Sequence, residues 1–163
     1  MPRLALYQPD IPQNTGTILR MAACLGVAVD VIAPMGFDMT DRALRRAGLD
    51  YLDHVEIRRH GSFDEFNAWR LGENRRLILF TSHGAVAHHV CDVRARDVLL
   101  LGRESAGVPE AVHRIADARV RIPMRPGLRS LNIAVAAAMA LSDALQKTCG
   151  WPDALALPGS GVS

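Results

Sequence analysis

Polar residues that can bind or activate a ligand gather in three short segments of the sequence. The first holds Asn14 and Arg20, the second is residues 102–109 with Glu104 inside it, and the third is residues 122–132. The third segment carries two prolines and two arginines between a strand-like run and an alanine-rich, helix-like run. Prolines exclude regular structure from such a junction, so backbone N–H groups are left to face a polar ligand. The pattern predicts a ligand site at a loop between a strand and a helix.

Each segment also has an interpretation without a ligand. Asn14 is placed to cap a helix, which would leave Arg20 as a surface residue. Residues 102–109 can form a plain turn, and their glycines fit neither the dinucleotide-binding pattern nor the P-loop pattern. Ser130 is placed to cap the last helix, whose alanines can simply pack. Asn132 is harder to explain by packing, because a polar side chain at the start of an apolar helix needs a partner.

Length and composition favour one compact domain. The chain has 163 residues, of which 49% are hydrophobic and 22% are charged, enough for one core and too few for two comfortable domains. We expect a single domain over residues 1–150 and a tail over residues 151–163, where Pro, Gly and Ser are frequent. No apolar run approaches the ~20 residues that span a bilayer, and the first residues do not resemble a signal peptide. A cytoplasmic protein without membrane contact is therefore expected.

The cysteines and histidines predict no metal site. Cys24, Cys91 and Cys149 show no C-x-x-C spacing, and two of them have helix-like apolar surroundings, which predicts buried thiols in a reducing compartment. The adjacent residues His88 and His89 do not match metal-ligand spacing, because neighbouring side chains point apart. We expect a site that works without a metal ion.

The basic residues are eighteen arginines and a single lysine, with a formal net charge of only +2. Arginine binds phosphate through a planar fork of donors, so clustered arginines are candidates for contacts with a nucleic-acid backbone. A GC-rich genome that encodes Arg in place of Lys explains them equally well, and composition leaves both interpretations open. The candidates are Arg45, Arg46, Arg58, Arg59, Arg75 and Arg76, with Arg119, Arg121, Arg125 and Arg129 around the third segment.

Apolar periodicity predicts an α/β fold with a mostly parallel sheet flanked by helices. Strands are expected at residues 3–8, 27–32, 54–59, 76–81, 97–101 and 119–122. Helices are expected at residues 14–26, 40–48, 62–72 and 131–147, with short ones within 82–93 and after Pro109. The last helix has an apolar face at Leu131, Val135, Ala138, Leu141 and Leu145, and its alanines allow a second helix to approach closely, as in a subunit interface.

In this order, the three segments resemble the SPOUT superfamily of RNA methyltransferases. Within it they are most similar to the tRNA (cytidine/uridine) 2′-O-ribose methyltransferase branch, the TrmL group. The likeness covers nearly the whole chain. It is carried by residues 6–16 (LYQPDIPQNTG) with Arg20, by 34–37 (PMGF) and 44–51 (LRRAGLDY), and by 102–109 (GRESAGVP), 122–124 (IPM) and 129–132 (RSLN).

The resemblance implies a C-terminal trefoil knot, a homodimer, and S-adenosylmethionine bound in the knot. It places Arg20 at the target 2′-hydroxyl, with Asn14 and Asn132 near it and Glu104 supporting the site. The implied activity is methylation of the wobble nucleotide, a cytidine or modified uridine in the anticodon loop of leucine tRNAs. The implied cofactor contacts are Phe80, Gly102, Glu104, Ile122, Ser130 and Leu131.

Methyl transfer from a sulfonium needs alignment of donor and acceptor, and help for the hydroxyl to lose its proton. An arginine, with a pKa above ~12, is a poor general base, so Arg20 is expected to stabilise the alkoxide while the proton leaves through a neighbour or water. Two other functions stay open: methylation of rRNA or of another tRNA position, and RNA binding without catalysis. The absence of G-x-G-x-x-G disfavours a nicotinamide-linked oxidoreductase.

Overall fold

A seven-stranded sheet forms the centre of the computed structural model, which describes residues 1–38, 42 and 49–152. All the pairings between strands are parallel, and the strand order is β3-β2-β1-β6-β4-β7-β5. The expected α/β class with a parallel sheet is confirmed. The strands are β1 (Arg3–Tyr7), β2 (Val29–Ile32), β3 (Ile57–His60), β4 (Leu77–Phe80), β5 (Val86–Ala87), β6 (Val98–Leu101) and β7 (Ala118–Arg121).

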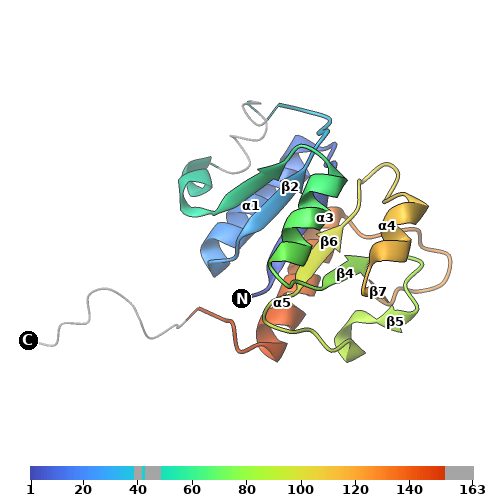
Figure 1. Ribbon diagram of the computed structural model, residues 1–163. Coiled ribbons are helices and arrows are strands. Elements are labelled where there is room, and N and C mark those ends of the chain that lie inside the picture. Colours follow the sequence, from blue (N-terminus) through green and yellow to red (C-terminus); the bar gives the residue numbers. More distant parts are fainter. Residues whose placement is uncertain (39–41, 43–48, 153–163) are drawn as a thin grey trace, which may run out of the picture.

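Helices cover both faces of this sheet (Figure 1). On one face α1 and α5 lie against each other, with Ile18 and Leu141 in the shared core. On the other face Phe66 of α3 and Val112 of α4 pack in a second apolar cluster. The helices are α1 (Pro12–Leu25), α3 (Phe63–Gly72), α4 (Glu110–Ile115) and α5 (Ile133–Lys147), with 3-10 helices η1 (Leu49–His54) and η2 (His88–Val90).

The central strands β4 and β6 are apolar along their length because each of their faces is covered. Ile78 and Leu99 face the cluster under α1 and α5, whereas Leu79 and Leu100 face the cluster under α3 and α4. All four side chains are fully buried. Parallel strands of this kind end at one common edge, where loops can build a ligand site.

A buried charged network joins β1, β2 and β3. Asp30 is fully buried, and its two oxygens are held by Arg3 Nε at 2.7 Å and by His60 Nε2 at 2.8 Å. Arg3 also donates to Glu56 at 2.9 Å, and its guanidinium lies over the ring of Trp69. A buried carboxylate requires such partners, so the network fixes the register of these three strands at a point that the sequence did not single out.

Two helix starts differ from the sequence prediction. Helix α1 begins at Pro12 instead of Asn14, because the fixed φ of proline suits the first helical position, and Ile11 takes the N-cap. The N-cap of α5 is Asn132 instead of Ser130: the Asn132 side chain accepts hydrogen bonds from the N–H groups of two residues in the first turn. Asn14 therefore lies inside its helix, at the third residue, and Asn132 takes the capping role that was predicted for Ser130.

Other boundaries shift for local reasons. The strand expected at 54–59 is β3, displaced by the preceding η1, and the last strand ends at Arg121. The segment 82–93 holds β5 and the 3-10 helix η2 where a short helix was expected. The Ser62 cap of α3 is confirmed, since Glu65 N–H donates to Ser62 Oγ at 3.2 Å. The expected helix at 40–48 and the tail from residue 153 lie outside the described residues.

The expected apolar face of α5 is only half right. Leu141 and Leu145 are buried, but Leu131, Val135 and Ala138 are exposed. The buried side consists mostly of alanines, because α5 packs closely on α1 and the sheet, and close packing favours small side chains. The same helix thus carries an outward-facing apolar stripe, which we define as Val135, Ala138 and Met139.

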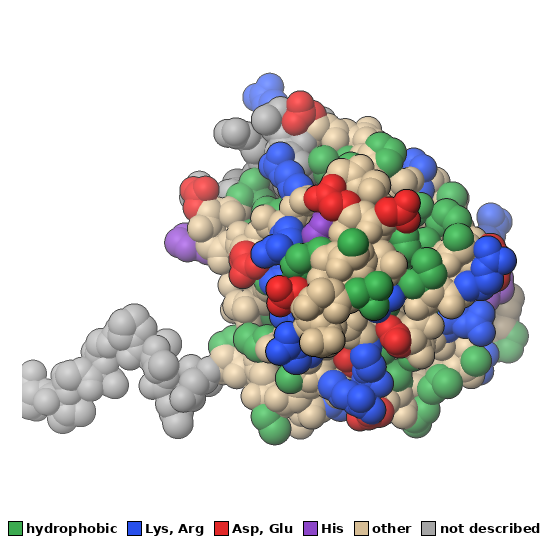
Figure 2. All heavy atoms as spheres, viewed as in Figure 1, with side chains coloured by type: hydrophobic (Ala, Val, Ile, Leu, Met, Phe, Trp, Pro, Cys, Tyr) green, Lys and Arg blue, Asp and Glu red, His purple; other side chains and the backbone are tan. Residues whose placement is uncertain are grey.

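The molecular surface carries charges of both signs. Figure 2 shows acidic and basic side chains interspersed over one face, in keeping with the net charge of +2. Cys24 and Cys149 are exposed, contrary to the expectation of buried thiols, because they lie near the last turn of α1 and just after α5. None of the described helices is long and apolar enough to cross a membrane.

Candidate active site

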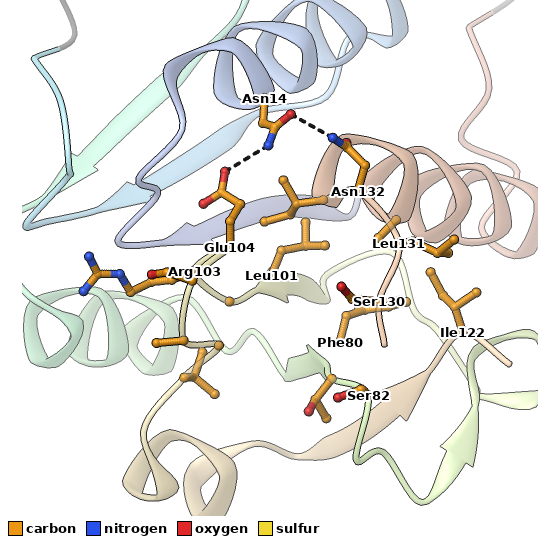
Figure 3. A pocket seen from close by; sticks show the side chains of 18 of the residues that line it. Asn14, Phe80, Ser82, Leu101, Arg103, Glu104, Ile122, Ser130, Leu131 and Asn132 are labelled. Carbon is orange, nitrogen blue, oxygen red and sulfur yellow. Dashed lines mark hydrogen bonds between the residues drawn. The ribbon is translucent and has the colours of Figure 1, made fainter. Parts of the chain in front are cut away.

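A cavity of about 750 Å³ opens at the carboxyl ends of β1, β4, β6 and β7 (Figure 3). Because these strands are neighbours in the sheet, the loops that follow them converge on one place. The start of α5 closes the cavity. Eight of the nine residues that the sequence suggested line it: Asn14, Phe80, Gly102, Glu104, Ile122, Ser130, Leu131 and Asn132.

One wall of the cavity is a tight loop of backbone after β6. Arg103 and Gly107 exchange two backbone hydrogen bonds, at 3.0 and 2.9 Å. A side chain at Gly102 would place its Cβ 2.8 Å from the backbone of Gly107, and Gly107 itself has a left-handed φ of +66°. Only glycine fits both positions without strain. The loop therefore presents N–H and C=O groups at the cavity in place of bulky side chains.

A second close contact fixes the loop that follows β4. A Cβ at Gly84 would lie 2.3 Å from the carbonyl carbon of Val120, so this loop rests directly on the backbone of β7. Thr81 N–H donates to the carbonyl oxygen of Val120 at 2.9 Å. The contact holds Phe80 and the residues after it at the cavity wall. Nothing in the sequence singled out Gly84.

A chain of side-chain hydrogen bonds joins the three segments (Figure 3). Asn132 Oδ1 is occupied by the N–H groups of the first turn of α5, so its Nδ2 is the atom that donates to Asn14 Oδ1, at 3.0 Å. Asn14 Nδ2 must then face Glu104, and it lies 3.5 Å from Oε1. The helix cap thereby fixes the orientation of both amides. Residues far apart in the sequence are oriented as one unit.

Asp10, an acidic residue that the sequence did not suggest, lies next to Glu104. The N–H of Asp10 donates to Glu104 Oε2 at 3.1 Å, and the Ser105 hydroxyl donates to Asp10 Oδ2. Arg103 Nε lies 3.5 Å from the same oxygen of Asp10. The contact between the two carboxyl groups lowers the pKa of Asp10 to about 2, whereas burial and the same contact raise the pKa of Glu104. Asp10 follows strand β1, and its position at that edge was the available signal.

Arg20 is the one suggested residue that does not line the cavity of its own chain. Arg20 lies six residues after Asn14, which turns it roughly 120° around the helix from Asn14. Its exposed guanidinium lies over the ring of Tyr51 in η1, 4.7 Å from the ring centroid. Because such stacking restrains a long side chain, Tyr51 sets the direction in which Arg20 points.

Residues 1–142 match the model of the SpoU rRNA methylase family over most of the chain. The chain belongs to this family. The expected resemblance to RNA methyltransferases is thereby confirmed, and among SpoU relatives the similarity extends beyond the motifs. The tRNA (cytidine(34)-2′-O)-methyltransferase of Beijerinckia indica is 58% identical over 144 residues, which cover 88% of this chain and 90% of that relative.

Solved structures agree with the SpoU assignment. One described as "Structural insights into the 2-OH methylation of C/U34 on tRNA" is 41% identical, with a TM-score of 0.86 over 90% of this chain and 95% of that chain. The SpoU methyltransferase AviRb from Streptomyces viridochromogenes, in complex with the cofactor AdoMet, is 27% identical, with a TM-score of 0.81 over 90% of this chain and 57% of that chain. The described residues of this SpoU chain contain no group of three or more His, Cys, Asp or Glu side chains that could hold a metal ion.

Proposed function

We propose that this protein transfers a methyl group from S-adenosylmethionine to the ribose 2′-hydroxyl of the wobble nucleotide, nucleotide 34, of a tRNA. The 58% identity to a relative named for that reaction is the observation that carries the proposal. From the resemblance noted above, the substrates are leucine tRNAs with cytidine or a modified uridine at this position. An unpaired anticodon nucleotide can be splayed into a site without melting a duplex, which suits a small enzyme.

The residues of the cavity fit S-adenosylmethionine. Phe80, Ile122 and Leu131 offer apolar surface, and the loop at Gly102 offers backbone groups that can pair with the edge of an adenine ring. The bound cofactor would supply a methyl carbon already activated by the sulfonium. The protein then has to align the hydroxyl with that carbon and exclude water. No metal ion enters this scheme.

The polar residues divide the remaining work. Asn14 and Asn132 hold Glu104 at the cavity through the hydrogen-bond chain, and Arg20 stabilises the developing alkoxide and the adjacent phosphate. Arg119, Arg121, Arg125 and Arg129 are exposed and form no ion pair within the described part of the chain. Because the last two flank the cavity-lining residues Met124 and Ser130, we assign this group to contacts with the anticodon-loop backbone.

We further propose that the protein works as a homodimer through α5 and carries the trefoil knot of its superfamily. The outward stripe of α5 supports the dimer: Val135 and Met139 are 50% and 39% exposed, and a second copy would cover them. The close contact between Gly84 and β7 supports the knot, because it brings the loop after β4 against the segment that leads into residues 122–132.

The reaction is tested with labelled S-adenosylmethionine and total tRNA from a strain that lacks the gene. Mapping of 2′-O-methylated nucleotides is expected to show label at nucleotide 34 of leucine tRNAs. Label at another tRNA position, or in rRNA alone, would replace the proposed substrate. Tight cofactor and RNA binding without any transfer would favour the binding protein over the enzyme.

A further inference from the structure

The Asp10–Glu104 pair contains a buried acceptor without a donor. Asp10 Oδ2 receives the Ser105 hydroxyl, but Asp10 Oδ1 is buried and has no hydrogen-bond partner. Buried acceptors in native proteins are almost always satisfied. Arg103 Nε is also buried without a hydrogen-bond partner, but it lies near the other oxygen, Asp10 Oδ2, at 3.5 Å. The neighbouring amides and the Ser105 hydroxyl are already committed, so the adjoining group that can carry a movable proton is the carboxyl of Glu104. A proton taken up by the Glu104 carboxylate would satisfy Asp10 Oδ1.

We infer that Glu104 takes up the proton of the target hydroxyl, an inference that rests on the proposed function. Asp10 is then a positioning residue that makes Glu104 a stronger base. As the new carbon–oxygen bond forms, the carbon–sulfur bond breaks and its electron pair stays on sulfur, which becomes a neutral thioether. The hydroxyl proton moves to the Glu104 carboxylate. The proton then leaves from Glu104 to solvent when the product departs.

The charges around the pair favour this division of roles. Asp10 stays ionised chiefly because of its contact with the Glu104 carboxyl, and Arg103, on the same loop as Glu104, adds a smaller contribution with its Nε 3.5 Å from Asp10 Oδ2. The elements facing Glu104 from the other side, α1 and the start of α5, contribute the neutral amides of Asn14 and Asn132. Burial and the ionised Asp10 raise the pKa of Glu104, which brings a carboxylate closer to the pKa that suits a base near neutral pH.

The backbone holds Asp10 in place. A Cβ at Gly36 would lie 2.9 Å from both Cα and Cβ of Asp10, and Gly36 N–H donates to the carbonyl oxygen of Pro9 at 2.9 Å. Gln8, two residues before Asp10, has a left-handed φ of 45° that non-glycine residues rarely adopt. A strained turn braced by the 34–37 segment thus aims Asp10 at Glu104. This gives residues 34–37 a role that the sequence alone left unexplained.

Titration of Glu104 in the unliganded protein tests the pair directly. The chain has five glutamates, so protein labelled with ¹³C at the glutamate carboxyl gives few resonances, and Glu104→Gln identifies the one that belongs to Glu104. We expect this carboxyl to titrate above the other four in the wild-type protein, and at lower pH in Asp10→Asn. An ordinary titration of Glu104 in the wild type overturns the inference. The wild-type titration can be measured without RNA and without a folded variant at Asp10.

The single-turnover rate of tRNA methylation as a function of pH tests the chemistry. The wild-type rate is expected to rise with pH through the pKa of Glu104, and Asp10→Asn is expected to move that midpoint down by about one pH unit. Glu104→Gln is expected to lower the rate roughly 100-fold, and its rate should no longer rise with pH through that midpoint. Asp92→Asn is the matched control, because Asp92 is exposed and its side chain pairs with Arg94 outside the cavity.

The outcomes separate the two proposals. Wild-type rates in Glu104→Gln, or an unmoved midpoint in Asp10→Asn, would overturn the role of the pair while leaving the methyltransferase activity in place. If the wild-type protein transfers no methyl group to tRNA, the proposed function is wrong. The carboxyl titration would still decide whether Asp10 and Glu104 share a proton.

Discussion

At the scale of single residues, Arg20 is the one proposed site residue that lies outside the cavity. Its guanidinium is exposed on α1 and stacks on Tyr51, so it is restrained before any substrate arrives. A guanidinium can contact a phosphate and a ribose oxygen together, whereas an ammonium is a point charge that does not stack as a plane. If Arg20 has the proposed role, the fork of the guanidinium, more than its charge, is the feature that the role requires.

Arg20→Lys is expected to lower the single-turnover rate of tRNA methylation by about tenfold or more, with S-adenosylmethionine affinity unchanged. The affinity should not move because Arg20 does not line the cavity. Arg94→Lys is the matched control, since the Arg94 guanidinium is also exposed and pairs with Asp92 outside the cavity. Near-normal turnover in Arg20→Lys would remove the need for a forked donor.

Some of the cavity-lining residues could be predicted from the unusual composition of segments at the ends of strands, whereas Phe80, Ile122 and Leu131 came only from the resemblance to RNA methyltransferases. Asn14, Glu104 and Asn132 were found in this way, but their mutual hydrogen bonds depend on how distant loops meet. Asp10 was missed because an acidic residue after a strand is common in turns, and only the fold brings it to Glu104. The cap of α5 was assigned to Ser130 for a similar reason, since spacing permits either residue.

At the scale of elements, the start of α5 combines a helix cap with the orientation of the site. Asn132→Ala is expected to cost about 1 kcal/mol in the free energy of unfolding and to free the amide of Asn14. Ser130→Ala should leave stability unchanged within about 0.5 kcal/mol, because its hydroxyl does not cap the helix. Urea unfolding of both variants measures the difference. Equal losses would restore Ser130 as the cap.

The loop after β4 requires glycine at position 84. Gly84→Ala is expected to destabilise the protein by roughly 2 kcal/mol or more, because the added methyl group would meet the backbone of β7, which cannot move aside as a side chain can. Thermal or urea unfolding measures the loss, and cofactor affinity should fall with it, since Phe80 shifts.

Gly72→Ala is the control for this substitution. Gly72 ends α3, has nothing within 4 Å of an added Cβ and has no positive φ, so alanine there should be neutral or slightly stabilising. Equal stability of the two variants would contradict the close approach of the loop to β7. The strands themselves were predictable from apolar runs, but this contact was not, because it depends on backbone distance and leaves no side-chain pattern.

At the scale of the whole molecule, α5 has two apolar faces, which explains why the apolar periodicity of the sequence predicted its buried face only half correctly. The helix is apolar nearly all round, so periodicity could not tell which side meets the core. Packing on α1 buries alanines and leaves Val135 and Met139 outside. The exposed apolar stripe of α5 lies near the cavity, and the opposite side of the helix is already packed. A second copy of the chain would bury this stripe.

Val135→Glu combined with Met139→Glu is therefore expected to convert a dimer to a monomer, because two charges would have to be desolvated at the centre of the interface. Light scattering coupled to size-exclusion chromatography measures the mass. Leu71→Glu is the control: Leu71 is 56% exposed on α3, on the opposite face of the sheet, so its substitution should leave the dimer intact. A wild-type protein that is monomeric at micromolar concentration, or a dimer that survives both glutamates, would place the interface elsewhere or remove it. The monomeric variant should keep its fold, since neither residue contributes to the buried side of α5.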